Sequence, residues 1–320
     1  MMAHLGVAQS TPSPQAPAPQ IQFYSPGPTA FVQWAGSHSP LGAVTSLTED
    51  LGYNFTSHIG ADIGLPLYTT RTPFSIYTDK DWRYTTILGT PYIDVRYTTK
   101  TRSGVNLATI LTGAFGLDSI RTYSTGRTIL DWYNHFDHEF KPLGPTLTYT
   151  PFLNFGAGNG TFDRAVMASP YSTCRPYETF GYIANGEFGG TFTYRRIYKL
   201  SGSVHALLPM GPQKVFSRLV SPDSLIAGDG SHDRFFDRFF ETISPLALDY
   251  LCTPTSAIYC NTTSVIARDN GFSTWLEVKR FRNFSIEVGY TRSVHYAYDS
   301  AFVMLTYDGT ALLRNMTTGE

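Results

Sequence analysis

Charge, cysteine and long apolar runs are all scarce in this chain of 320 residues. Only 15% of the residues are charged, whereas soluble domains have roughly 25%. No stretch approaches the ~20 consecutive apolar residues of a membrane-spanning helix, which excludes a helical membrane protein. The formal net charge is −1 and no basic patch is present, so a nucleic-acid partner is not expected.

Cysteine is limited to Cys174, Cys252 and Cys260. None forms a CxxC pair, and no histidine cluster has the spacing of zinc ligands, so neither a metal site nor a cofactor is expected. Cys252 and Cys260 are close enough in sequence to form a small disulfide loop in an oxidising compartment. The alternative is that all three cysteines are unpaired thiols.

Aromatic residues are abundant, at 15% of the chain, and they recur in segments with a period of two. One example alternates through Ile93, Asp94, Val95, Arg96, Tyr97 and Thr98. A strand points such residues alternately to its two faces. The runs reach ~10 residues or more, the length of a tilted strand that crosses a bilayer, whereas ~5–6 is usual in soluble proteins.

Twelve such segments are predicted as strands, near residues 27–36, 42–55, 58–70, 85–100, 105–118, 128–140, 145–158, 177–195, 199–210, 271–281, 284–296 and 300–313. Their connections mostly alternate between short turns, on the side of both termini, and long loops. The first and last hairpins have short connections on the other side as well. This alternation predicts an all-β fold, a transmembrane antiparallel up-and-down β-barrel of about 12 strands over residues 27–313.

Three segments stand apart from the strands. Residues 1–26 are expected to be the remnant of a signal peptide followed by a flexible N-terminal segment, and residues 314–320 a short C-terminal tail. The connection 211–271 is far longer than ordinary loops. Within it, one helical face is predicted by the spacing of Phe235, Phe236, Phe239, Phe240 and Ile243. We expect a partly helical extracellular loop here, with a further pair of strands as the alternative.

The ionisable residues share one parity of the strands, which we expect to face the lumen. The predicted lumen residues are Asp62, Asp94, Arg96, Asp131, His135, Asp137, Glu139, Glu187, Arg195, His205, Glu277, Lys279 and Glu287. Acids outnumber bases among them, so an open pore would favour cations. Lipid is expected to contact the rings of Tyr97, Trp132, Tyr149, Tyr182, Tyr194 and Tyr290.

The densest part of this set runs from Asp131 to Glu139. A histidine between carboxylates can act as a general base, but a hydrogen-bonded network in the lumen explains the same residues. No nucleophilic Ser or Asp arrangement accompanies them, so no catalytic residue is predicted.

In these patterns, and in local sequences such as Gly60 to Tyr68 and Glu287 to Ser293, the chain resembles outer-membrane β-barrel proteins of Gram-negative bacteria, and among them an acidobacterial group. The resemblance covers residues 27–313 and implies lipid and the barrel-assembly machinery as partners. It departs from that class at the C-terminus, because such barrels usually end on an aromatic residue, whereas residues 314–320 follow the last predicted strand here. We expect a pore for small solutes or a structural barrel. The alternatives are a secreted or periplasmic all-β binding protein and a barrel-embedded hydrolase.

Overall fold

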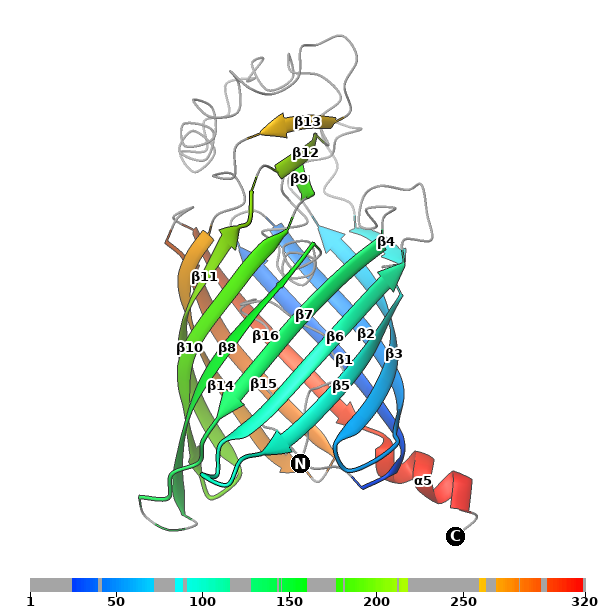
Figure 1. Cartoon of the computed structure of the whole chain (residues 1–320), viewed down its shortest axis with the longest axis vertical. Coiled ribbons are helices and arrows are strands. Elements are labelled where there is room, and N and C mark those ends of the chain that lie inside the picture. Colours follow the sequence, from blue (N-terminus) through cyan, green and yellow to red (C-terminus); the bar gives the residue numbers. More distant parts are fainter. Residues whose placement is uncertain are drawn as a thin grey trace.

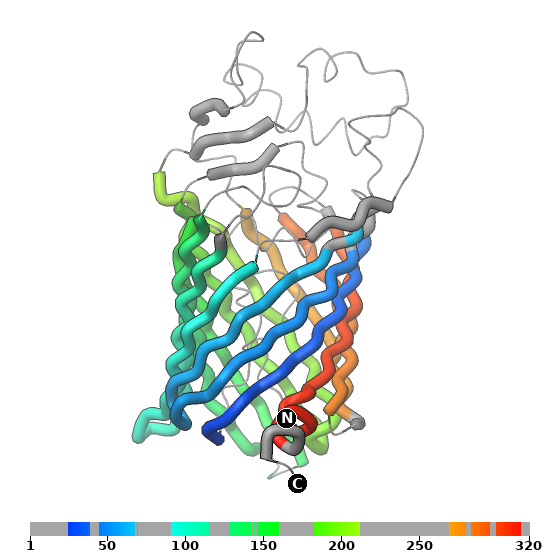
Figure 2. Tube along the Cα trace, turned by 90° about the vertical axis from the view of Figure 1, so that its right-hand side faces the viewer, coloured from blue at the N-terminus to red at the C-terminus, as the bar shows by residue number. Residues whose placement is uncertain are grey.

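A computed structural model describes the positions of residues 25–39, 42–71, 84–88, 91–115, 128–142, 144, 146–159, 177–180, 182–211, 213–217, 259–262, 269–281, 283–294 and 298–318. Within them, antiparallel pairing of consecutive barrel strands produces one closed sheet (Figures 1 and 2). The first strand pairs with the last, from Phe31 opposite Asp308 to His38 opposite Ala301, so the sheet has no open edge over this span.

Twelve positions make up the barrel wall, as the sequence predicts. They are held by β1 (Gly27–Ser39), β2 (Gly42–Asn54), β3 (Ile59–Arg71), β4 (Tyr84–Leu88) in line with β5 (Tyr92–Lys100), β6 (Asn106–Phe115), β7 (Thr128–Asp137), β8 (Leu147–Gly158), β10 (Ile183–Tyr194), β11 (Tyr198–Pro209), β14 (Asp269–Phe281), β15 (Phe284–Ser293) and β16 (Tyr298–Asp308).

A second, three-stranded sheet lies above the barrel on the side of the long connections (Figure 1). It consists of β9 (Tyr177–Phe180), β12 (Gln213–Ser217) and β13 (Tyr259–Thr262). The predicted strand 177–195 is therefore two strands, of which only β10 belongs to the wall. The connection 211–271 contributes β12 and β13 near its two ends. The predicted helical face at 235–243 lies outside the described residues.

Burial is reversed relative to a soluble protein. Along β5, Asp94 and Arg96 are 0% and 2% exposed, whereas Ile93 and Val95 are 43% and 50% exposed. Apolar side chains thus cover the outside of the wall, and polar side chains line the inside. A band of this kind would be an aggregation hazard in water but matches the hydrocarbon of a bilayer. Glu49 of β2 interrupts the band with an exposed charge.

The predicted lipid-facing rings point outward. Tyr97, Trp132, Tyr182 and Tyr194 are between 43% and 57% exposed, and Tyr149 and Tyr290 are partly exposed. Within the described residues, helices reach neither the length nor the apolarity required for a membrane span.

The C-terminus differs from the prediction. The final strand ends at Asp308, and helix α5 (Thr310–Thr318) follows in place of residues 310–313 of the strand and the tail. A carboxylate oxygen of Asp308 accepts a hydrogen bond from the Thr310 N–H at 2.9 Å, which caps the helix start. The run Ala311, Leu312, Leu313 and Arg314 consists of strong helix formers, so alternation stops there.

Helix α5 also covers an exposed stretch of β1. Since Phe31 is opposite Asp308, the residues before Phe31 extend past the end of β16. The Ala30 N–H donates to the Thr310 hydroxyl at 3.2 Å, and the Arg314 Nε–H donates to the Pro28 carbonyl at 3.1 Å. These contacts take the place of strand pairing and protect the backbone edge.

Candidate functional site

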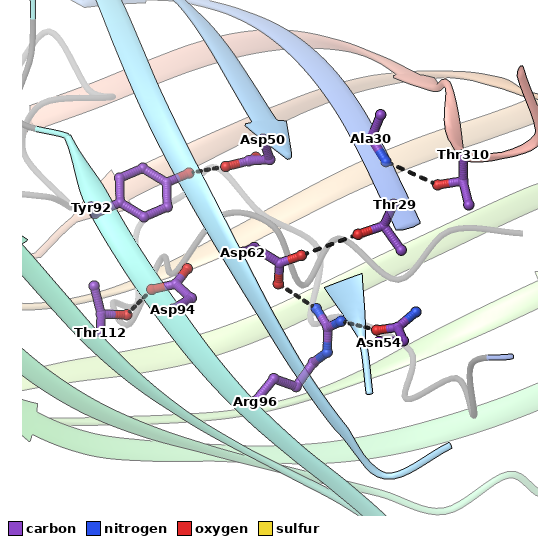
Figure 3. A network of polar contacts seen from close by, with 10 residues as sticks. All are labelled: Thr29, Ala30, Asp50, Asn54, Asp62, Tyr92, Asp94, Arg96, Thr112 and Thr310. Carbon is purple, nitrogen blue, oxygen red and sulfur yellow. Dashed lines mark hydrogen bonds and ion pairs between the residues drawn. The ribbon is translucent and has the colours of Figure 1, made fainter. Parts of the chain in front are cut away.

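The inner wall of the barrel is the candidate site, and inward-facing glycines determine its geometry. Gly64 of β3 stands between Asp50 of β2 and Tyr92 of β5 in the register. The Tyr92 ring lies across Gly64, where an added Cβ would be 2.1 Å from the ring, and its hydroxyl donates to Asp50 at 2.5 Å (Figure 3). The missing side chain lets one residue span two strands.

An inward-facing glycine also makes room for the side chain of Arg96. Its guanidinium crosses Gly60 and donates to the side-chain Oδ1 of Asn54 at 2.6 Å and to the Asp62 carboxylate at 2.7 Å (Figure 3). Both charged side chains of this ion pair are at most 2% exposed. Asp62 in turn crosses Gly52 and accepts from the Thr29 hydroxyl at 3.4 Å. This network links β1, β2, β3 and β5 on the lumen side of the barrel wall.

A second network joins β6, β7, β8 and β10. One ring nitrogen of His135 contacts the Asn154 side-chain oxygen at 2.5 Å and the other contacts Asp137 at 3.0 Å. The Asn154 amide donates to Glu187 at 2.7 Å, and Asn106 donates to Asp137 at 2.6 Å. Both ring nitrogens of His135 are therefore engaged by side-chain oxygens of neighbouring residues.

A third group lies on β11, β14 and β15. The Lys199 ammonium donates to the Glu277 carboxylate at 2.7 Å. Glu287 faces Glu277 directly across the β14–β15 pair and is 3% exposed. Within the described part of the chain, Oε1 of Glu287 and the Nζ of Lys279 have no hydrogen-bond partner. The wall thus presents an unpaired carboxylate oxygen.

Three aromatic rings pack together inside the barrel, namely Phe152, Trp275 and Phe302. Gly289 is opposite Trp275 on one side and Phe302 on the other, and a Cβ there would lie 2.3 Å from the Phe302 ring and 2.8 Å from Trp275 Cβ. Gly189 accommodates Phe152 in the same way, with a Cβ–ring distance of 2.4 Å. The inner wall therefore combines polar networks with an aromatic cluster.

Most of the predicted lumen residues take the inward positions. The buried ones are Asp62, Asp94, Arg96, Asp131, His135, Asp137, His205, Glu277 and Glu287. Glu187 and Lys279 are partly buried. The Thr112 hydroxyl donates to Asp94 (Figure 3). In the described residues, no group of three His, Cys, Asp or Glu side chains is placed to hold a metal ion.

Two predicted lumen residues are elsewhere. Glu139 lies beyond the end of β7, is exposed, and pairs with Lys141 at 3.0 Å. Arg195 lies in the turn between β10 and β11 with a φ of 51°, and its guanidinium is 5.1 Å from the centre of the Tyr194 ring. Both predictions were wrong because the alternation of residue types continues past the point where the strand ends.

Sequence reasoning also missed inward residues. Asp50 is 2% exposed and Asp269 is 8% exposed, and Lys199 is held by Glu277. Asp50 could have been found from its parity with Ser46 and Thr48. Asp269 precedes the predicted start of its strand. Cys252 lies outside the described residues, so the disulfide to Cys260 stays a prediction.

The fold is similar to that of an outer-membrane channel from Pseudomonas putida F1, with a TM-score of 0.51 and 8% identity over 92% of this chain and 99% of that chain. The NanC porin matches with a TM-score of 0.43 and 5% identity over 86% of this chain and 98% of that one. No protein-family model and no curated protein matches the sequence. The chain thus shares the closed antiparallel β-barrel fold of that outer-membrane channel. Its acidobacterial affinity stays a prediction.

Proposed function

We propose that this protein is a narrow outer-membrane channel for small solutes that favours cations. The charge of the inner wall carries the proposal. Among the described residues, the inward acids are Asp50, Asp62, Asp94, Asp131, Asp137, Glu187, Asp269, Glu277 and Glu287, and the inward lysines and arginine are Arg96, Lys199 and Lys279. This excess of acids attracts cations into the interior and repels anions.

The strand number supports a narrow passage. Twelve strands lie between the eight-stranded barrels that side chains fill and the wide 16- to 18-stranded porins. In addition, the Gly60, Gly64 and Gly289 positions let long side chains lie along the wall. An interior of this width accommodates only small solutes.

The two alternatives fit the structure less well. A secreted binding protein would bury its apolar strand face against a second sheet, but Val95 and Phe188 are 50% and 60% exposed on the outside of the barrel. A hydrolase that used His135 as its base would need a free ring nitrogen, and Asn154 and Asp137 occupy both.

Planar bilayers test the channel directly. With a KCl gradient across the membrane, we expect discrete conductance steps and a reversal potential of the sign set by K⁺, because the inner wall is acidic. The same preparation should need detergent and should migrate differently on a gel after heating. A folded protein with no conductance steps, or one that selects chloride, would contradict the proposal.

The long connection gives a second test. We expect it to narrow the extracellular mouth. Deleting residues 221–256 removes no strand that the structure describes, since β12 ends at Ser217 and β13 begins at Tyr259. The barrel should therefore still fold and its conductance should rise. Unchanged conductance would make the connection a surface feature, and failure to fold would show that the segment contributes to the barrel.

A further inference from the structure

The aromatic cluster and the unpaired carboxylate occupy the same part of the wall. Trp275 is opposite Gly289, and Glu287 lies two residues before Gly289 on the same face of β15. Glu287 is therefore the diagonal neighbour of Trp275, at a Cα separation of roughly 7–8 Å. On the other side, Phe302 is opposite Gly289 and Met304 is opposite Glu287.

We propose that this part of the lumen binds a small organic cation, with Glu287 as the counter-charge and Trp275 and Phe302 as the aromatic wall. The proposal rests on the cation-favouring channel and names its solute class. An ammonium group is attracted both by a carboxylate and by the face of an aromatic ring. The methyl or methylene groups of such a solute pack against the same rings, as a bare metal cation cannot.

Glu287 faces Glu277 across the β14–β15 pair and is nearly fully buried, so its charged form is costly until a cation binds beside it. Glu277 is already engaged by Lys199 at 2.7 Å. The acidic groups that attract Lys279 are Glu277 and Asp308, and Asp308 lies at the short-turn end of β16. Glu287 is 3% exposed, yet its Oε1 has no partner in the described part of the molecule. A buried carboxylate oxygen is costly unless something pairs with it.

The indole N–H refines the ligand class. Trp275 is 3% exposed, and its Nε1 also lacks a hydrogen-bond partner among the described residues. A ligand that carries an oxygen close to its ammonium group would satisfy this donor while its charge faces Glu287. The site therefore fits an amino alcohol or a comparable ammonium compound better than a purely hydrocarbon cation.

Fluorescence titration of the full-length protein in detergent micelles tests this. We expect choline chloride to change the tryptophan emission saturably, whereas NaCl at equal ionic strength does not. Glu287→Gln should raise the apparent Kd by about 30-fold, the loss expected when a buried hydrogen bond between charged groups is removed while the aromatic rings stay in place. Trp275→Phe should abolish the emission change. Tetramethylammonium, which has no oxygen, should bind more weakly than choline.

Glu187→Gln is the matched control, because it removes an equal charge from the lumen at a carboxylate that Asn154 already holds. We expect it to change the apparent Kd by less than about threefold. The heat-modifiable band on a gel reports whether a variant has folded. If Trp275→Phe fails to give this band, Phe302→Leu replaces it as the variant that tests the aromatic wall. Equal effects of the Glu187 and Glu287 variants, or no saturable response of the wild type, would overturn the site. Since micelle titration needs no conduction, the channel can stand when the site fails, and the reverse also holds.

Discussion

Arg96→Met should destabilise the barrel by about 3–5 kcal/mol, the usual result of breaking a buried ion pair from one side. The substitution keeps an unbranched side chain comparable to the aliphatic stem of arginine but removes the guanidinium, which leaves the Asp62 carboxylate without its counter-charge. It also removes the 2.6 Å donor to Asn54. The free energy of unfolding in urea, measured on protein folded into lipid vesicles, gives the change.

The double variant Arg96→Met/Asp62→Asn separates charge from packing. An asparagine needs no counter-charge and can still accept the hydrogen bond from Thr29. We therefore expect the double variant to regain most of the stability lost by Arg96→Met. If the two losses simply add, the ion pair is not coupled in the folded barrel, and the network of Figure 3 is misassigned.

Val288→Arg should cost roughly 2–4 kcal/mol, because Val288 is 44% exposed on the outside near the middle of β15. There an arginine would enter the hydrocarbon core of the bilayer. The change is measured by the same refolding titration in vesicles. Val288→Met, which keeps the position apolar, should cost less than about 1.5 kcal/mol.

The matched control is an outward-facing position closer to the end of its strand, and therefore closer to the surface of the bilayer. Leu51 is 62% exposed on the same outer face but lies close to the end of β2 at Asn54. An arginine there can reach the interface, so Leu51→Arg should cost only about 0–1 kcal/mol. Equal losses at Val288 and Leu51 would mean that the outer face is not surrounded by a bilayer of graded polarity.

The wall of the barrel could be predicted because one face of each strand meets lipid and the other does not. That requirement fixes a period of two, as in Asp94 and Val95, and it is visible without any structure. The ends of strands were less predictable, since a strand ends where the neighbouring strand no longer pairs with it. Thus the segment 177–195 divides into β9 and β10, and β16 gives way to α5 at Asp308.

The contacts inside the lumen could not be predicted from parity. Parity places Arg96 and Asp62 on the inner face, but only the register shows that Gly60 lies between Arg96 and Asn54. The same holds for Trp275 and Glu287, which are linked through the pairing of β14 with β15. Inward glycines were visible in the sequence, yet their role depends on which side chain the neighbouring strand supplies.

The contact between Arg314 and Pro28 spans 286 positions of the chain, and it has a consequence for the order of folding. Contacts between such distant residues carry a high entropic cost of loop closure and form late. The seam between β1 and β16 therefore cannot close until nearly the whole chain is available. Until that moment β1 and β16 would both expose unpaired backbone groups at the edges of an open sheet, and the contacts of α5 with β1 would be among the last to form.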